Sequence, residues 1–205
     1  MAAWISHGMD HFPAVAATGG RAPRVLELGC GLGIVGLAVA KVFPSLRVTL
    51  SDFDSAVVAN LDKNIHLSFP ALTQTSGPLA SRIDVADVDI RDFTKDAVDT
   101  CGLSKYSHLL GQFDLIIASD VVYDATHCQL GHVCRALLAP VQPAEAALIR
   151  WVPRAVFLLP DSRPRLREVV RSWEEAGLDV RIERVLPSVE LVRKLRQTHD
   201  GWGAG

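Results

Sequence analysis

A glycine-rich segment near the start of the chain constrains its fold more than any other feature. Residues 27–33 read Glu-Leu-Gly-Cys-Gly-Leu-Gly, with glycine at every second position from the third residue on. The apolar run of residues 24–28 leads into this segment, and residues 34–42 follow with the apolar spacing of a helix. A strand, a glycine loop and a helix in this order are typical of nucleotide-binding α/β sheets.

Strand-like and helix-like segments alternate along the rest of the chain. Further strands are predicted over 46–51, 82–90, 113–118, 155–159 and 178–186, and helices over 55–67, 125–138 and 163–176. Asp54 or Ser55 is expected to cap the first of these helices. Residues 94–111 form a poorly patterned insertion. The alternation predicts an α/β fold, a Rossmann-like, doubly wound and mainly parallel sheet with helices on both faces.

Length and composition fit a single domain over residues 1–205. Of the 205 residues 49% are hydrophobic and 21% charged, which is enough to build a sizeable core. We expect residues 1–22 to form a lid segment ahead of the glycine loop. Residues 201–205 have no strand pattern, so we expect a last strand to be missing or truncated.

Charge, cysteine content and hydropathy exclude several classes of protein. The net charge of −2 provides no overall attraction for nucleic acid, so a nucleic-acid partner is disfavoured. Four scattered cysteines do not make a disulfide scaffold, which favours a reducing compartment, the cytoplasm or alternatively the nucleus. No stretch approaches the roughly 20 apolar residues that span a bilayer, so we expect a soluble protein without a membrane partner.

The glycine loop fits two classes of cofactor. Residues 31–36 satisfy GxGxxG with Asp52 further on, the fingerprint of NAD-binding proteins. Glu27 and Gly29 extend this pattern to ExGxGxG. A carboxylate at this position would repel a pyrophosphate, whereas it would balance the ammonium of S-adenosylmethionine. The pattern therefore favours S-adenosylmethionine. The expected contacts are Glu27, Gly29, Gly31 and Gly33.

Two later segments supply candidate contacts to the adenosine part of the cofactor. We expect Asp52 at an exposed strand end, where its carboxylate accepts both ribose hydroxyl hydrogens; the alternative is a simple turn residue. Phe53 would cover one face of the adenine, with core packing as the alternative. Asp92 is a candidate acceptor for the adenine amino group, and Asp87 and Asp89 are acidic alternatives.

Four segments carry a family resemblance. They are residues 25–36, residues 48–52 (Val-Thr-Leu-Ser-Asp), Asn64, and residues 113–123 (Phe-Asp-Leu-Ile-Ile-Ala-Ser-Asp-Val-Val-Tyr). Over about residues 20–125 the chain resembles the seven-β-strand (class I) S-adenosylmethionine-dependent protein-lysine methyltransferases. The resemblance implies methyl transfer to a lysine of a protein substrate. The chain departs from the family where the third strand ends, because the family usually has a tryptophan there. Trp4 is the candidate for a second family tryptophan, ahead of the glycine loop.

The last of these segments implies the acceptor side of the site. Residues 120–123 look like the family's DxxY motif, and the resemblance also places Ser119 among the donor contacts. A lysine amine has a reference pKa of about 10.4 and must lose a proton before it attacks. Asp120 would orient the amine and take its proton, and Tyr123 would add a hydroxyl and an aromatic wall. The alternatives are helix capping by Asp120 or Asp124 and core packing by Tyr123.

One cluster of metal-ligand residue types does not predict a metal site. It comprises His127, Cys128, His132 and Cys134. At about 100° per residue, Cys128 and His132 share one face of a helix while the other two lie on another face. The four residues cannot converge from this helix alone, so no metal is expected.

The leading hypothesis is therefore a protein-lysine methyltransferase that uses S-adenosylmethionine. The alternatives are a methyltransferase for a histidine or a small molecule, and a noncatalytic scaffold that binds the donor. An NAD-dependent oxidoreductase is disfavoured by Glu27 and by the lack of a convincing hydride-transfer set.

Overall fold

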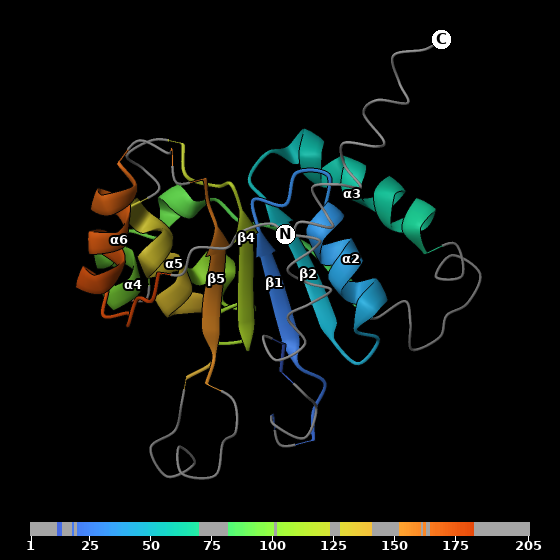
Figure 1. The fold of residues 1–205 in the computed structure, drawn as a ribbon, viewed down its shortest axis with the longest axis horizontal. Helices are drawn as coiled ribbons and strands as arrows, with labels where there is room; N and C mark the ends of the chain where they lie inside the picture. The colour runs from blue at the N-terminus through green and yellow to red at the C-terminus, as the bar shows by residue number, and fades with distance from the viewer. Residues whose placement is uncertain are drawn as a thin grey trace, which may run out of the picture.

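The computed structural model describes residues 12–13, 18, 20–69, 82–100, 102–123, 128–140, 152–160, 162 and 165–182. Its centre is a parallel sheet with the strand order β3-β2-β1-β4-β5 (Figure 1). The strands are β1 (Arg24–Leu28), β2 (Arg47–Asp52), β3 (Ile83–Asp87), β4 (Leu115–Ser119) and β5 (Arg154–Leu158). Every neighbouring pair is parallel, which confirms the predicted Rossmann-like sheet.

Helices cover both faces of this sheet, as predicted. Figure 1 shows α2 (Ile34–Val42) and α3 (Ser55–Ser68) on one face and three helices on the other. The second group is α4 (Lys95–Asp99), α5 (Leu130–Leu137) and α6 (Leu166–Glu175). Two 3-10 turns, η4 (Ile90–Asp92) and η5 (Ser104–Tyr106), lie between β3 and β4. Among the described residues no helix is long and apolar enough to cross a membrane.

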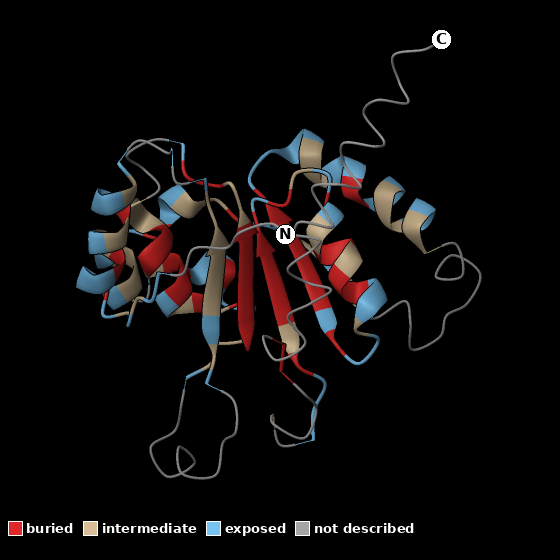
Figure 2. Cartoon of the chain, viewed as in Figure 1, coloured by how far each residue is buried: buried red, intermediate tan, exposed pale blue. Residues whose placement is uncertain are grey.

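Two hydrophobic cores lie on the two faces of the sheet, because successive side chains of a strand point in opposite directions. Leu26 and Ile116 belong to the core under α5 and α6, whereas Val25 and Ile117 belong to the core under α2 and α3. In Figure 2 the central strands β1, β2 and β4 are buried along most of their length, while β5 is more exposed.

A partly buried ion pair joins the amino ends of β1 and β4. The guanidinium of Arg21 donates from Nη1 and Nη2 to the two carboxylate oxygens of Asp114, at 2.7 and 2.5 Å. The backbone N–H of Arg24 donates to the same carboxylate at 2.8 Å. Asp114 is 2% exposed, so these partners replace the water that its carboxylate oxygens would otherwise contact. The chain ahead of the glycine loop is thereby attached to the sheet.

The structure corrects two predictions about the fold. Residues 94–111 are not a featureless insertion, because they hold α4 and η5 and bury Leu103, Tyr106 and Leu109. The strand expected over 178–186 is wrong for residues 178–182, which pair with no strand; residues 183–186 lie outside the described part. The apolar alternation there reflects packing of side chains against the helix-covered core, not a sheet edge.

Candidate functional site

The carboxyl ends of β1, β2 and β4 bring the predicted site residues to one edge of the sheet. Leu28, at the end of β1, pairs with Ser51 of β2 and with Ala118 of β4. The residues that follow these three strands are therefore neighbours in space. In open α/β sheets ligands bind at this edge, outside the carboxyl ends of the strands.

The glycine loop after β1 is held from several sides. Gly29, Gly31 and Gly33 have φ angles of 59°, 53° and 74°, a region that favours glycine. The backbone N–H of Cys30 donates to the carbonyl of Ser51 at 2.9 Å. Asn64, which belongs to the family resemblance, donates from Nδ2 to the carbonyl of Leu32 at 3.0 Å. These bonds tie the loop to β2 and to α3.

Gly31 offers the open backbone that a bound cofactor needs. A Cβ built on Gly31 would have no heavy atom within 4 Å. By contrast, a Cβ on Gly33 would lie 3.0 Å from Leu50 and 3.1 Å from Leu61, so Gly33 serves close packing of the loop on the core. The loop thus has one glycine that faces open space and one that faces the core.

Asp52 anchors the loop and is not at an exposed strand end as predicted. It is 9% exposed. Its Oδ2 accepts a hydrogen bond from the N–H of Gly31 at 3.1 Å, and its Oδ1 accepts from the N–H groups of Phe53 and Asp54 at 2.9 and 3.2 Å. A carboxylate has about four acceptor positions, so about one is left for a ribose hydroxyl. Asp52 is a turn residue whose carboxylate also lies beside the loop.

Glu27 lies on the face of β1 that α2 covers. It is 3% exposed, and its Oε2 accepts a hydrogen bond from the N–H of Gly36 at 2.8 Å. The N-cap of α2, Gly33, has no side chain, so Glu27 supplies the acceptor that a cap residue would otherwise provide. Burial raises the pKa of Glu27 to about 7; the bond from Gly36 opposes this rise and the charge of Asp52 adds to it. A nearby cation would stabilise the charged form of this buried carboxyl.

The glycine loop and the residues after β4 touch each other. A Cβ on Gly29 would lie only 2.9 Å from Cγ1 of Val121, which is itself 7% exposed. Val121 is the second residue of the predicted DxxY motif. The predicted donor loop and the predicted acceptor segment are therefore in direct contact, and only glycine leaves room for that contact.

The acceptor residues have an unusual backbone and an exposed ring. Asp120 has a φ of 56°, and its N–H donates to the carbonyl of Leu158 at 2.9 Å. Backbone strain in a residue other than glycine is found most often at functional sites. Tyr123 is 62% exposed, so core packing is the wrong alternative for it. The N-cap of α5 is Gln129, and residues 124–127 lie outside the described residues, so helix capping by Asp120 or Asp124 stays the alternative for these two residues.

Ser119 ends β4 one residue before this strained position. It is half-buried and pairs with Leu158 of β5. It lies directly before the residues that resemble the DxxY motif, at the carboxyl end of β4. Its role as a contact to the donor stays a prediction.

The predicted adenine contacts gather beside Asp52. The N–H of Val88 donates to the carbonyl of Asp52 at 3.0 Å, which brings the η4 turn next to the end of β2. Phe53 is 59% exposed, so core packing is the wrong alternative, and the guanidinium of Arg91 lies 5.2 Å from its ring centroid. Asp92 accepts a hydrogen bond from the hydroxyl of Tyr106 at 2.5 Å.

A comparison with known protein families identifies the family to which this chain belongs. Residues 1–142 match the family described as lysine methyltransferase. The chain is a member of the lysine methyltransferase family. The matched residues include the glycine loop, Asp52 and the segment from Asp120 to Tyr123. Membership also removes the NAD-dependent oxidoreductase as an alternative.

Two relatives match this lysine methyltransferase family member at low identity. Ribosomal RNA small subunit methyltransferase C of Actinobacillus succinogenes is 28% identical over 142 residues, 67% of this chain and 34% of that protein. Calmodulin-lysine N-methyltransferase of Arabidopsis thaliana is 26% identical over 159 residues, 77% of this chain and 44% of that protein. The chain thus spans less than half the length of these two relatives.

A solved structure supports the fold. The TehB-like SAM-dependent methyltransferase of Corynebacterium glutamicum superposes with a TM-score of 0.53 and 18% identity. The superposition covers 93% of this chain and 78% of that one. At this identity the likeness concerns the fold alone.

The rejected zinc cluster is only partly within the described residues. Cys128, His132 and Cys134 are described, and His127 is not. In the described part of the chain, no three His, Cys, Asp or Glu side chains are placed to hold a metal ion. Cys134 is fully buried, and burial raises its pKa to about 12, so it remains a neutral thiol packed in the core.

Tyr106 is a residue near the site that sequence reasoning missed. It comes from the insertion between β3 and β4, and it is 1% exposed. Residues 94–111 are poorly patterned, and only their tertiary packing reveals that this hydroxyl reaches Asp92. The one available signal was local: Leu103, Tyr106 and Leu109 are apolar residues spaced by three.

Proposed function

We propose that this protein transfers the methyl group of S-adenosylmethionine to a lysine side chain of a protein. One observation carries the proposal: the glycine loop of a lysine methyltransferase family member is packed against the Asp120–Tyr123 segment through Gly29 and Val121. A donor site and an acceptor site must adjoin for direct transfer, because the two reacting atoms have to be held in line.

The residues at the edge of the sheet fit the donor. The open face of Gly31 gives room for close backbone approach, and the remaining acceptor position of Asp52 suits a ribose hydroxyl. Glu27 would balance the ammonium group, and Phe53 and Asp92 would lie along the adenine. Ser119 completes the proposed donor contacts. When bound, the donor would supply a methyl group on a positively charged sulfur. The neutral thioether, S-adenosylhomocysteine, is then a good leaving group.

The acceptor chemistry follows from Asp120 and Tyr123. Lysine enters as an ammonium, so Asp120 would attract it, orient it and accept or relay one proton. The freed lone pair of the nitrogen forms the new bond to the methyl carbon, while the electrons of the carbon–sulfur bond stay on sulfur. Tyr123 would face the incoming lysine with its hydroxyl and with its ring, which favours a cationic side chain.

RNA methylation is a second candidate function. It is favoured by one observation, the similarity to ribosomal RNA small subunit methyltransferase C. The net charge of −2 argues against it, because RNA binding depends on neutralising phosphates with basic side chains. The family match over residues 1–142 places the protein-lysine proposal first.

The working compartment that we propose is the cytoplasm. The three cysteines within the described part, Cys30, Cys128 and Cys134, are free thiols, which suits a reducing environment.

The test is transfer of a labelled methyl group. Purified protein and radiolabelled S-adenosylmethionine are incubated with a cell extract, and labelled bands are identified by mass spectrometry. We expect methyl-lysine in a protease-sensitive band, with less label from the Asp120→Ala variant. Label that is lost on ribonuclease treatment would replace the proposal with RNA methylation. Methyl-histidine, or a labelled small molecule, would change the acceptor. Saturable binding of the donor without any transfer would favour the noncatalytic scaffold.

A further inference from the structure

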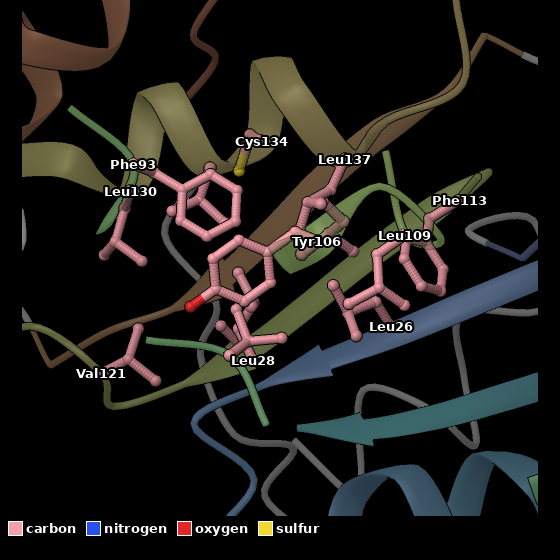
Figure 3. Close-up of a cluster of buried hydrophobic side chains, with 14 of the residues drawn as sticks. Leu26, Leu28, Phe93, Tyr106, Leu109, Phe113, Val121, Leu130, Cys134 and Leu137 are labelled. Carbon is pink, nitrogen blue, oxygen red and sulfur yellow. The ribbon is translucent and has the colours of Figure 1, made fainter. Parts of the chain in front are cut away.

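A buried tyrosine from the insertion reaches the adenine side of the proposed donor site. The ring of Tyr106 packs on the ring of Phe93, with centroids 4.7 Å apart and planes tilted by 33°. Figure 3 shows this ring between Phe93 and Leu28, with its hydroxyl at the end that points away from Leu109 and Phe113. The ring is held by the core while the hydroxyl reaches out of it.

The hydroxyl of Tyr106 makes two hydrogen bonds, one to each end of the η4 turn. It donates to Oδ2 of Asp92 at 2.5 Å and accepts from the backbone N–H of Asp89 at 3.2 Å. Asp89 is the N-cap of the turn and Asp92 is its last residue. One rigid side chain therefore fixes both the entry and the exit of a three-residue turn.

The protonated state of Tyr106 keeps this arrangement at neutral pH. Burial raises the pKa of Tyr106, and the hydrogen bond to Asp92 adds to the rise. Lys105 lies beside the same carboxylate, with its Nζ 3.8 Å from Oδ2 of Asp92 and 3.7 Å from Oδ2 of Asp87. Asp92 is thus held by a neutral donor and a neighbouring cation.

The turn lies where the adenine of the proposed donor would be. Val88, the residue before the N-cap, donates its N–H to the carbonyl of Asp52, the proposed ribose contact. From the middle of the turn, Arg91 reaches the ring of Phe53. In the donor the adenine is attached to the ribose. An adenine that extends from a ribose bound at Asp52 along this turn would therefore lie against the acidic side chains of η4.

We infer that Tyr106 is a positioning residue for adenine recognition: its hydroxyl holds the η4 turn so that the Asp92 carboxylate can accept a hydrogen bond from the adenine 6-amino group. The inference rests on the proposed function, since it assumes that the donor binds at this edge of the sheet. Without the hydroxyl, the half-exposed carboxylate of Asp92 can turn toward Lys105 or solvent, and the N–H of Asp89 loses its partner.

The experiment compares two ligands that differ only at the adenine amino group. Calorimetry measures binding of S-adenosylhomocysteine and of its 6-deamino analogue, which has a hydrogen in place of the purine 6-amino group. The proteins are wild type, Tyr106→Phe, Asp92→Asn and the double variant. Thr94→Ala is the matched control, because it removes the hydroxyl that caps α4 in the same insertion without touching the turn.

We expect Tyr106→Phe to weaken binding of S-adenosylhomocysteine roughly ten-fold and to leave binding of the analogue almost unchanged. Tyr106→Phe should cost nothing further in the Asp92→Asn background. Thr94→Ala should leave both affinities unchanged, even where it lowers the melting temperature.

Three outcomes overturn the inference. They are equal loss for both ligands in Tyr106→Phe, no loss for either, and the same ligand selectivity in Thr94→Ala. Failure of the wild-type protein to bind S-adenosylhomocysteine would overturn the proposed function as well, so the two failures are distinguishable.

Discussion

Gly29 and Val121 lie so close that a methyl group on Gly29 would stand 2.9 Å from Cγ1 of Val121. This contact joins the loop after β1 to the segment after β4. Glycine is therefore needed at this position for two reasons. Its φ of 59° favours glycine, and any larger side chain would need Val121 to move.

We expect Gly29→Ala to destabilise the fold by about 1–3 kcal/mol and to weaken donor binding, because the residue must keep a positive φ and avoid Val121. Urea unfolding and calorimetry with S-adenosylhomocysteine measure the two effects. Adding Val121→Ala should recover part of the loss, the part due to the clash. If the double variant recovers nothing, the backbone angle alone makes glycine necessary.

Asp52→Ala should lower both stability and donor affinity, since the carboxylate holds the N–H of Gly31 as well as the proposed ribose. Each lost bond to a charged acceptor is worth about 1.5–3 kcal/mol. Asp54→Ala is the control: it removes the cap of α3, which accepts from the N–H of Ala56, and should cost about 0.5–2 kcal/mol of stability with unchanged donor affinity. Normal donor affinity of folded Asp52→Ala would leave Asp52 as a turn residue only.

Glu27 should make stability depend on pH. Its pKa is raised to about 7 in the folded protein, from an ordinary value of 4.5. Between these values the folded state holds a proton that the unfolded state has released, so stability falls as pH rises from about 4.5 to 7 and then levels off. A shift of this size corresponds to about 3 kcal/mol. Glu27→Gln, which keeps an oxygen for Gly36, should flatten this part of the curve. Parallel curves of unfolding free energy against pH for both proteins would disprove the assignment.

The Arg21–Asp114 pair should stabilise the amino edge of the sheet. Removing one partner of a buried pair costs up to about 3–5 kcal/mol, and the half-exposed side chain of Arg21 reduces this figure. We therefore expect Asp114→Ala to cost more than Arg21→Ala in urea unfolding, because Asp114 also accepts from the N–H of Arg24. Lys95→Ala, which breaks an exposed pair with Asp99, should leave the free energy of unfolding nearly unchanged, because solvent and salt screen such a pair. Equal costs for all three variants would contradict the burial argument.

Asp120→Ala and Tyr123→Phe should retain donor binding and reduce methyl transfer, because both residues are proposed to act on the nucleophile. Asp120→Ala is expected to be the more severe, since Tyr123→Phe keeps the aromatic wall. Initial rates on the identified substrate should rise toward alkaline pH, as expected for a lysine amine of pKa about 10.4. A plateau near neutral pH would indicate a histidine acceptor. Unchanged rates in both variants would remove these residues from the mechanism.

Local signals in the sequence determined much of the fold. The bounds of β1 and α2 agree with the predicted 24–28 and 34–42, and Asp54 caps α3 as expected. Each of these signals involves residues that are close together in the chain. They are the strand that leads into the glycine loop, the cap residue and the apolar spacing of the helix. The glycine loop and the segment after β4 were recognisable as motifs for the same reason, and their residues lie at one sheet edge as predicted.

Only the tertiary structure decided what these residues touch. The sequence does not show that Glu27 caps α2 through Gly36, that Asp52 is buried beneath Gly31, or that Tyr106 reaches Asp92. Nor does it show that Leu178 and Val180 pack against the helix-covered core while Ile182 is exposed and residues 178–182 pair with no strand. Each of these facts depends on contacts between residues far apart in the chain, and the burial and pKa of a polar group follow from such contacts. Periodicity reports which face of an element is apolar; the packing of the whole sheet decides which partner that face, and each buried charge, will meet.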